Sequence, residues 1–323
     1  MVPIKGVPAR QTKPPSRTAG NALSPPPNQS PDPESSVAGA QGSILPSSSN
    51  SAAVQSSIPI VLSIAGYDPS AGAGVLADLK TFAAMGVYGM ASITALTIQS
   101  TQGVRKVIPL DPSTVVETLD CLAEDVCFDA IKVGMLGTAA VAAAVLAWLE
   151  GQENVPIVLD PVMKSSSGKD LLDCEGCEIL RRAGLARANW ITPNLAELAV
   201  LTGGSAPTNS EETENSAREL HRMATRYGNP AVKIVVTGGH AKTPDDLLLV
   251  DGMCRWFSGE RVETSSTHGT GCTFSSALAA RIALGDGPSE AVGHAKVYVT
   301  GALWNTFPIG MGTGPLNHSW EKT

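Results

Sequence analysis

Short apolar runs of strand length recur along the chain from residue 60 onward. They cover Ile60–Ala65, Ala91–Ile98, Ala130–Val133, Ile157–Asp160, Trp190–Thr192 and Lys233–Val236. Runs that stay apolar, rather than alternating with polar residues, are typical of strands buried on both faces. The pattern therefore predicts a central sheet with further layers on both of its sides.

Helical patterns lie between most of these runs. In the first of them Leu76, Leu79, Phe82 and Ala83 share one face. The predicted helices are Val75–Met85, Pro112–Asp125, Thr138–Glu150, Glu178–Ala186, Leu195–Thr202 and Glu211–Tyr227, and two more begin near Gly271 and Ser289. Alternation of strands and helices predicts an α/β fold with a mostly parallel sheet flanked by helices on both faces.

The pattern changes between Leu247 and Val262. A strongly apolar run reaches Asp251-Gly252, and a second run rich in apolar and aromatic residues follows. Asp-Gly between two such runs is a strong signal for a two-residue hairpin turn. We expect a small antiparallel hairpin here.

Residues 1–57 differ in composition from the rest. They hold 10 of the 23 prolines and 12 serines, and the first aromatic residue is Tyr67. A segment this poor in large apolar residues cannot bury enough surface to order itself, so we predict a disordered Pro/Ser-rich tail before a single domain at 58–323. Its basic, acid-free start is also faintly similar to an organellar targeting peptide, although the prolines oppose the amphipathic helix that such a peptide needs.

Charge and cysteine content restrict the partners and the cellular compartment that we expect for the protein. The net charge of −7 argues against nucleic acid or an anionic membrane as partner, and the longest apolar run, Val141–Leu149, is too short to span a bilayer. Six cysteines without a secretory signal indicate reduced thiols and a cytoplasmic protein. Cys174 and Cys177 have C-x-x-C spacing, but no second pair or nearby histidine completes a zinc site.

Two glycine-rich turns carry the most informative chemistry. Gly269-Thr270-Gly271-Cys272 precedes an apolar helical run, and Gly66–Gly74 follows the first strand. Backbone N–H groups at a helix start bind anions, and the same field favours a deprotonated Cys272 thiol. The spacing of the first turn matches neither a dinucleotide-binding nor a Walker A motif, and a plain helix start with a small buried cysteine is the competing interpretation of the second.

Acidic and amide side chains follow two further strands. Asp160 ends one strand, and Asn194 and Glu197 start the helix after the next. Oxygen ligands at strand ends suit Mg²⁺, whereas a helix cap with a first-turn acid is the alternative for Asn194 and Glu197.

Eight segments, in order, resemble the hydroxymethylpyrimidine and phosphomethylpyrimidine kinases of thiamine biosynthesis, members of the ribokinase-like superfamily. The segments are Ala65–Gly74, Ala77–Phe82, Ile93–Gln99, Lys132–Leu136, Leu159–Met163, Thr192–Glu197, Gly238–His240 and His268–Thr273. Together they make a specific match over about four-fifths of the chain, from Ile58 to His318.

The resemblance implies a ribokinase-like fold and ATP-dependent phosphorylation of hydroxymethylpyrimidine and then of its monophosphate, with Mg²⁺. It places Asp160 and Glu197 at the metal, Asn194, Thr237 and Lys296 at the nucleotide, and Gly269, Thr270, Gly271 and Cys272 at the transferred phosphate. The expected substrate-binding residues are Gly66, Asp68, Asp78, Gln99, Met135 and Val162. A loop from Lys164 to Lys169 resembles a mobile lid, and a homodimer is the oligomeric state expected from relatives.

Two departures from the family pattern affect these expectations. Thr237 stands where many members have lysine, and Leu76 stands where they often have a polar residue. Loss of that lysine weakens the case for the second step, in which an anionic substrate is held. Pyridoxal kinase activity and a non-catalytic pyrimidine-binding regulator are the two alternatives. Gln99 and Met135 argue against pyridoxal kinase activity. The presence of Cys272, Asp160 and Glu197 argues against a regulator without catalysis.

Overall fold

The structure is a computed structural model that describes residues 58–239 and 243–322. The predicted tail of residues 1–57 and His240, which belongs to one of the eight matching segments, lie outside the described residues.

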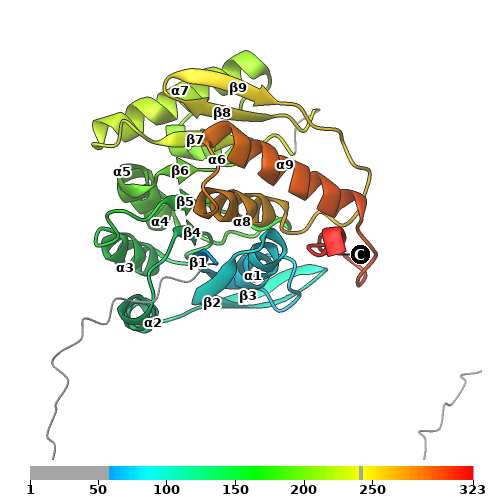
Figure 1. Cartoon of the computed structure of the whole chain (residues 1–323), viewed down its shortest axis with the longest axis horizontal. Helices are drawn as coiled ribbons and strands as arrows, with labels where there is room; N and C mark the ends of the chain where they lie inside the picture. Colours follow the sequence, from blue (N-terminus) through cyan, green and yellow to red (C-terminus); the bar gives the residue numbers. More distant parts are fainter. Residues whose placement is uncertain (1–57, 240–242, 323) are drawn as a thin grey trace, which may run out of the picture. The chain divides into compact units, whose positions relative to one another are not determined.

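One nine-stranded sheet forms the centre of the described chain, in the order β3-β2-β1-β4-β5-β6-β7-β8-β9 (Figure 1). Strands β2, β1, β4, β5, β6 and β7 run parallel, and β3, β8 and β9 are antiparallel to their neighbours. The bounds are β1 Ile60–Tyr67, β2 Tyr88–Ser100, β3 Gly103–Pro109, β4 Ala130–Val133, β5 Ile157–Leu159, β6 Trp190–Ile191, β7 Lys233–Val236, β8 Asp246–Val250 and β9 Met253–Phe257. The predicted mostly parallel sheet is confirmed.

The predicted hairpin is confirmed as β8 and β9. Its two turn residues, Asp251 and Gly252, both have positive φ values, 51° and 75°. Aspartate tolerates this backbone region and glycine adopts it without strain, so the Asp-Gly pair fixes the turn. A second antiparallel pair, β2 with β3, was not predicted from the sequence.

Helices cover both faces of the sheet (Figure 1). One face packs against the segment from α2 to α7, and the other against α1, α8 and α9. The bounds are α1 Gly74–Met85, α2 Pro112–Asp125, α3 Ala139–Leu149, α4 Cys174–Ile179, α5 Leu185–Arg187, α6 Leu195–Thr202, α7 Ser210–Arg226, α8 Thr270–Ala283 and α9 Pro288–Trp304, with a π-helical turn at Leu180–Gly184 between α4 and α5 and a short 3-10 helix at Trp320–Lys322.

The side-chain alternation of β1 explains this two-sided core. Leu62 and Ile64 point to the α2–α7 face, whereas Val61 points to the face of α1, α8 and α9, and all three are 0% exposed. Because successive side chains of a strand point to opposite faces, an unbroken apolar run needs a layer on each side.

The carboxyl ends of the parallel strands share one edge of the sheet. Gly66–Gly74 follows β1, Gln99 lies near the end of β2, and Asp160, Asn194 and Thr237 follow β5, β6 and β7. In α/β sheets this edge is where ligands bind. The fold therefore gathers residues that are distant in the sequence.

Candidate active site

The segment Gly269–Cys272, called the anion turn below, starts helix α8. Gly269 is the N-cap with φ 84° and ψ 15°, and no side chain caps the helix. A Cβ atom at Gly269 would lie 1.8 Å from the carbonyl oxygen of Gly72, so only glycine fits. The uncapped first-turn amides and the positive end of the helix dipole favour an anion at this point.

The first glycine loop, Gly66–Gly74, packs directly against the anion turn. The Asp68 carboxylate accepts hydrogen bonds from the Ser70 amide (2.8 Å) and hydroxyl (2.7 Å) and from the amides of Gly72 (3.3 Å) and Ala73 (2.9 Å). Burial alone raises the pKa of Asp68, but the hydrogen bonds from His268 and Ser70 hold it below its ordinary value. Asp68 is thus an ionised carboxylate that shapes the loop.

His268 joins three parts of the site. Its Nε2 lies 2.8 Å from Asp68 Oδ2 and 2.9 Å from the Nε2 amide nitrogen of Gln99. The ring also lies against Gly72, where a Cβ atom would be 2.5 Å from His268 Cδ2. One ring nitrogen carries at most one hydrogen, so Nε2 cannot both donate to Asp68 and accept from the Gln99 amide. The side-chain oxygen of Gln99 also accepts from the Thr97 hydroxyl at 3.3 Å, so one further N–H and one lone pair of the amide remain for a ligand.

An apolar wall lies next to Gly66 of the first glycine loop. Met135 packs with Ala95 and Leu171, and Val107 and Val162 pack against them. A Cβ atom at Gly66 would come within 2.8 Å of the Met135 sulfur. The structure thus brings together Gly66, Met135 and Val162, three of the residues predicted to bind substrate.

Asp160 is buried and Glu197 is half-buried, and the two carboxylates lie near enough to repel each other. Ser275 of α8 donates to Asp160 Oδ2 at 3.0 Å, and the Asn194 amide donates to Glu197 Oε2 at 2.9 Å. Burial, reinforced by the neighbouring Asp160, raises the pKa of Glu197 to about 8, and burial also raises the pKa of Asp160. Two carboxylates that resist ionisation together are suited to a divalent cation.

Asn194 and Glu197 also form the capping box of α6, as the alternative interpretation proposed. The Asn194 Oδ1 accepts from the amides of Ala196 and Glu197, both at 2.9 Å. Asn194 pairs through a parallel bridge with Thr237, whose amide donates to Pro193 at 3.0 Å. Asn194 and Thr237, which follow β6 and β7, therefore lie side by side at the sheet edge.

The predicted acidic thiol is wrong. Cys272 is half-buried, and burial raises the pKa of its thiol to about 12, although Lys132 opposes the rise. The Gly74 amide donates to its sulfur, which ties the anion turn to the first loop. The loss of water around the thiol is the largest influence on its pKa.

The interpretation of Asp78 as a substrate-binding residue also needs correction. Its side chain is 0% exposed and pairs with Lys132 at 2.9 Å. Ser63 and Ser276 donate to the same carboxylate. With every carboxylate oxygen already bonded inside the core, Asp78 has no face toward a ligand.

Lys296 lies at a second location, beside the β8–β9 hairpin. Its ammonium donates to the Pro244 carbonyl (2.6 Å) and Asp246 Oδ2 (2.8 Å), and Asp246 Oδ1 accepts from the Gly238 amide. It borders an open cavity of about 400 Å³ whose lining is Phe257, Ser258, Gly259, Glu260, Gly293, Lys296, Val297 and Thr300. This cavity has an apolar wall for a flat ring and a cation at its side.

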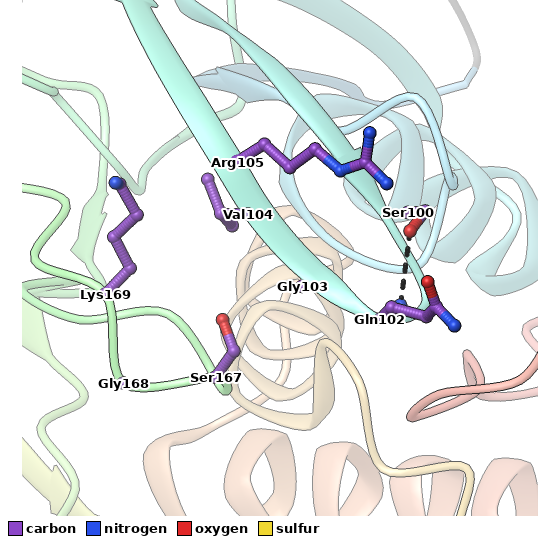
Figure 2. A pocket seen from close by; sticks show the side chains of 8 residues that line it. All are labelled: Ser100, Gln102, Gly103, Val104, Arg105, Ser167, Gly168 and Lys169. Carbon is purple, nitrogen blue, oxygen red and sulfur yellow. Dashed lines mark hydrogen bonds between the residues drawn. The ribbon is translucent and has the colours of Figure 1, made fainter.

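Figure 2 shows another cavity, of about 490 Å³, where the β2–β3 turn meets the predicted lid loop. Arg105 and Lys169 border it together with the hydroxyls of Ser100 and Ser167. Lys164 pairs with Asp170 at 3.4 Å on the exposed side of the loop. Ser100, one of the residues that line this cavity, directly follows Gln99 in the chain.

Sequence reasoning missed three residues of this region. His268 was quoted only as part of a motif, and Lys132 and Ser275 were not singled out as site residues. Their partners, Asp68, Asp78 and Asp160, are all more than 50 residues away in the chain, so no local pattern marks them.

Comparison with known proteins decides the family. The family model described as phosphomethylpyrimidine kinase matches residues 68–317. The chain belongs to the phosphomethylpyrimidine kinase family. The hydroxymethylpyrimidine/phosphomethylpyrimidine kinase of Staphylococcus aureus is 39% identical over 262 residues, covering 80% of this chain and 93% of that protein.

Another member of the family is part of a longer protein. The thiamine biosynthesis bifunctional protein of Geobacter sulfurreducens is 38% identical over 260 residues. The match covers 80% of this chain, which spans about half, 52%, of that protein's length.

Solved structures of two related kinases share the fold. The Bacillus subtilis pyridoxal kinase in complex with ADP has a TM-score of 0.74 and 31% identity, covering 82% of this chain and 99% of that one. The phosphomethylpyrimidine kinase of Clostridium difficile has a TM-score of 0.67 and 34% identity, covering 76% and 99%. The ribokinase-like fold and a kinase activity are therefore shown, with pyridoxal kinases as close relatives.

Two kinds of feature, a membrane-spanning helix and a cluster of metal-binding side chains, are absent from the residues that the structure describes. Within 58–239 and 243–322, no helix is both long and apolar enough to cross a bilayer. The same ranges hold no cluster of three or more His, Cys, Asp or Glu side chains arranged to bind a metal.

Proposed function

We propose that the protein transfers the γ-phosphate of ATP to hydroxymethylpyrimidine and then to the resulting monophosphate. The observation that carries the proposal is the meeting of the anion turn, the first glycine loop and Gln99 at His268. A pyrimidine held by Gln99 then has its hydroxymethyl group beside the amides of the anion turn.

Gln99 and the apolar wall account for substrate binding. An aminopyrimidine edge offers a donor and an acceptor, and a primary amide offers both in return. Met135 and Val162 supply apolar contacts for the ring, with the polarisable thioether of Met135 against its face.

Asp160 and Glu197 would hold Mg²⁺ together with oxygens of the nucleotide phosphates. Their raised pKa values fit this role, because a divalent cation relieves the repulsion between two neighbouring carboxylates. When bound, the metal supplies charge neutralisation for the triphosphate. Asn194 and Thr237 lie side by side at the sheet edge, and Lys296 of α9 bonds to Asp246, which accepts from Gly238 next to Thr237. We assign the 400 Å³ cavity beside Lys296 to the nucleotide base.

The anion turn stabilises the transferred phosphoryl group. Its uncapped amides and the α8 dipole face the charge that develops during transfer. Because the pKa of Cys272 is about 12, its thiol is protonated at neutral pH. Cys272 therefore orients the attacking hydroxyl by a hydrogen bond rather than acting as a resting thiolate.

Pyridoxal kinase activity is the second candidate function, favoured by the 0.74 TM-score to the Bacillus subtilis pyridoxal kinase. Gln99 favours hydroxymethylpyrimidine over pyridoxal, because its amide can pair with a ring edge that offers both a donor and an acceptor. A cytoplasmic location and a homodimer stay predictions from the sequence.

Production of ADP from MgATP, measured separately with hydroxymethylpyrimidine, its monophosphate and pyridoxal, tests the proposal. We expect turnover with both pyrimidines and at least about tenfold lower kcat/KM with pyridoxal. Pyridoxal as the better substrate would reverse the assignment, and no turnover with any of the three would support the non-catalytic regulator.

A further inference from the structure

A buried ion pair lies beneath the anion turn. Lys132 of β4 and Asp78 of α1 are both 0% exposed, and the ammonium is 3.0 Å from Oδ1 and 2.9 Å from Oδ2. Ser63 of β1 donates to Oδ2 at 2.6 Å, and Ser276 of α8 donates to Oδ1 at 2.7 Å. One carboxylate thus joins two strands and two helices.

Stability alone does not explain this pair. Removing two charges from water is costly, and replacing a buried ion pair by apolar groups is often neutral or stabilising. The layer of α1, α8 and α9 is packed mainly by apolar side chains, and the other polar residues buried in it, such as Thr81, Thr273 and Ser275, are uncharged. A charged network in this layer therefore indicates that β1, β4, α1 and α8 must be held in one specific arrangement.

The two helices in the network are the ones that begin at the proposed active site. Helix α1 starts at Gly74, whose amide donates to Cys272, and Asp78 lies one turn further along. Helix α8 starts at Thr270, and Ser276 follows Ser275, which donates to Asp160. The Asp78 carboxylate therefore ties the first part of α1 to the first part of α8, about one turn along α1 and nearly two turns along α8 from their starts.

We propose that Lys132 and Asp78 are positioning residues for phosphoryl transfer, which fix α1 against α8 so that the anion turn and the first loop face one phosphoryl group. Lys132, on strand β4 of the sheet, fixes the position of the Asp78 side chain. The hydrogen bond from Ser276 to Asp78 then fixes α8 relative to α1. The inference rests on the proposed function, because it assigns the phosphate to this pair of helix starts.

Ser276→Ala and Ser63→Ala form a matched pair of variants. Both hydroxyls are 0% exposed and donate to the same carboxylate, but only Ser276 lies on α8. We expect similar losses of thermal stability in the two variants. We expect kcat to fall about tenfold in Ser276→Ala and to stay within about twofold in Ser63→Ala, with KM for the pyrimidine unchanged in both.

The double variant Asp78→Asn with Lys132→Met removes both charges of this pair together, and with them the attraction of Lys132 for Asp160. We expect it to fold, with a melting temperature close to that of the unaltered chain, and to lose at least about tenfold in kcat. Wild-type kcat in this folded double variant, or equal kcat in the two serine variants, would overturn the proposal.

The same variants separate this inference from the proposed function. If the unaltered chain phosphorylates neither pyrimidine nor pyridoxal, the proposed function fails. The network is then tested by calorimetric binding of the ATP analogue AMP-PCP with Mg²⁺. Weaker binding in Ser276→Ala than in Ser63→Ala supports positioning, and equal binding overturns it.

Discussion

At the scale of single residues, burial governs the chemistry of this site more than local sequence does. Cys272 stands at a helix start, which favours a thiolate, yet burial raises its pKa to about 12. The sequence shows the helix start but not how much water the packed loops exclude. The position of Cys272 could thus be predicted, and its protonation state could not.

Replacement of Cys272 distinguishes an orienting thiol from a thiolate base. A serine hydroxyl can donate and accept a hydrogen bond but is not ionised at neutral pH. We expect Cys272→Ser to keep kcat within about tenfold of the unaltered enzyme and Cys272→Ala to lose about a hundredfold. Steady-state kinetics at saturating ATP measure this, and a serine variant as inactive as the alanine variant would restore the base role.

The raised pKa of Glu197 predicts a pH dependence of stability. A carboxyl group with a folded pKa of about 8 and an ordinary value of 4.5 takes up a proton on folding between those values. Stability therefore falls as pH rises through this window. Without Mg²⁺, we expect the melting temperature to fall by about 2–5 °C from about pH 7 to about pH 8, a range in which His318, with its pKa lowered to about 4, stays neutral.

Glu197→Gln is the control for this pH effect. The amide cannot ionise, so we expect a flatter profile in thermal unfolding scans. Identical slopes in the variant and the unaltered protein would show that Glu197 is not the responsible group.

At the scale of elements, the apolar pattern was sufficient for the strands and helices of the core. Helices α2 and α6 and strands β4 and β7 occur at the predicted bounds. Strand β3 was missed because this edge strand carries adjacent exposed charges, Arg105 and Lys106, and lacks a continuous apolar run. Only its pairing with β2 makes it a strand.

The contact between the two glycine-rich segments gives an element-scale prediction. Gly269→Ala places a Cβ atom 1.8 Å from the Gly72 carbonyl at a positive φ, so the first loop or the anion turn must move. We expect a loss of about 2–4 kcal/mol in unfolding free energy. Denaturant unfolding measures it.

Gly271→Ala is the matched stability control in the same turn. A Cβ atom there meets nothing within 4 Å, and the backbone has no positive φ. We expect its unfolding free energy to change by less than about 0.5 kcal/mol. Equal losses in the two variants would show that the contact with Gly72 is not the cause.

At the scale of the whole molecule, the sheet brings six chain segments to one edge, and this arrangement could be predicted from the alternation of strands and helices. The roles of Gln99, Asp160 and Glu197 came from the family resemblance, and their shared edge followed from a parallel sheet. The pairing of Asp78 with Lys132 could not be predicted, because it depends on how α1 packs on β4.

Substrate choice between the two phosphorylation steps is a property of the assembled site. Thr237 is neutral, and it lies beside Asn194 at the sheet edge where we expect the nucleotide phosphates and the phosphate of the substrate to meet. We expect Thr237→Lys to raise kcat/KM for the monophosphate by about tenfold, because it adds a cation near an anionic substrate, and to leave the free pyrimidine within about twofold. An equal effect on both substrates, or on neither, in steady-state kinetics would contradict this.

A crystal structure with AMP-PCP, Mg²⁺ and hydroxymethylpyrimidine tests the central claim most directly, through the distance from the hydroxymethyl oxygen to the γ-phosphorus. We predict a separation of about 3–3.5 Å, with the γ-phosphate on the amides of Gly269–Cys272 and the ring against Gln99 and Met135. A γ-phosphate bound away from the anion turn, or a pyrimidine outside the pocket of Gln99, would contradict the account.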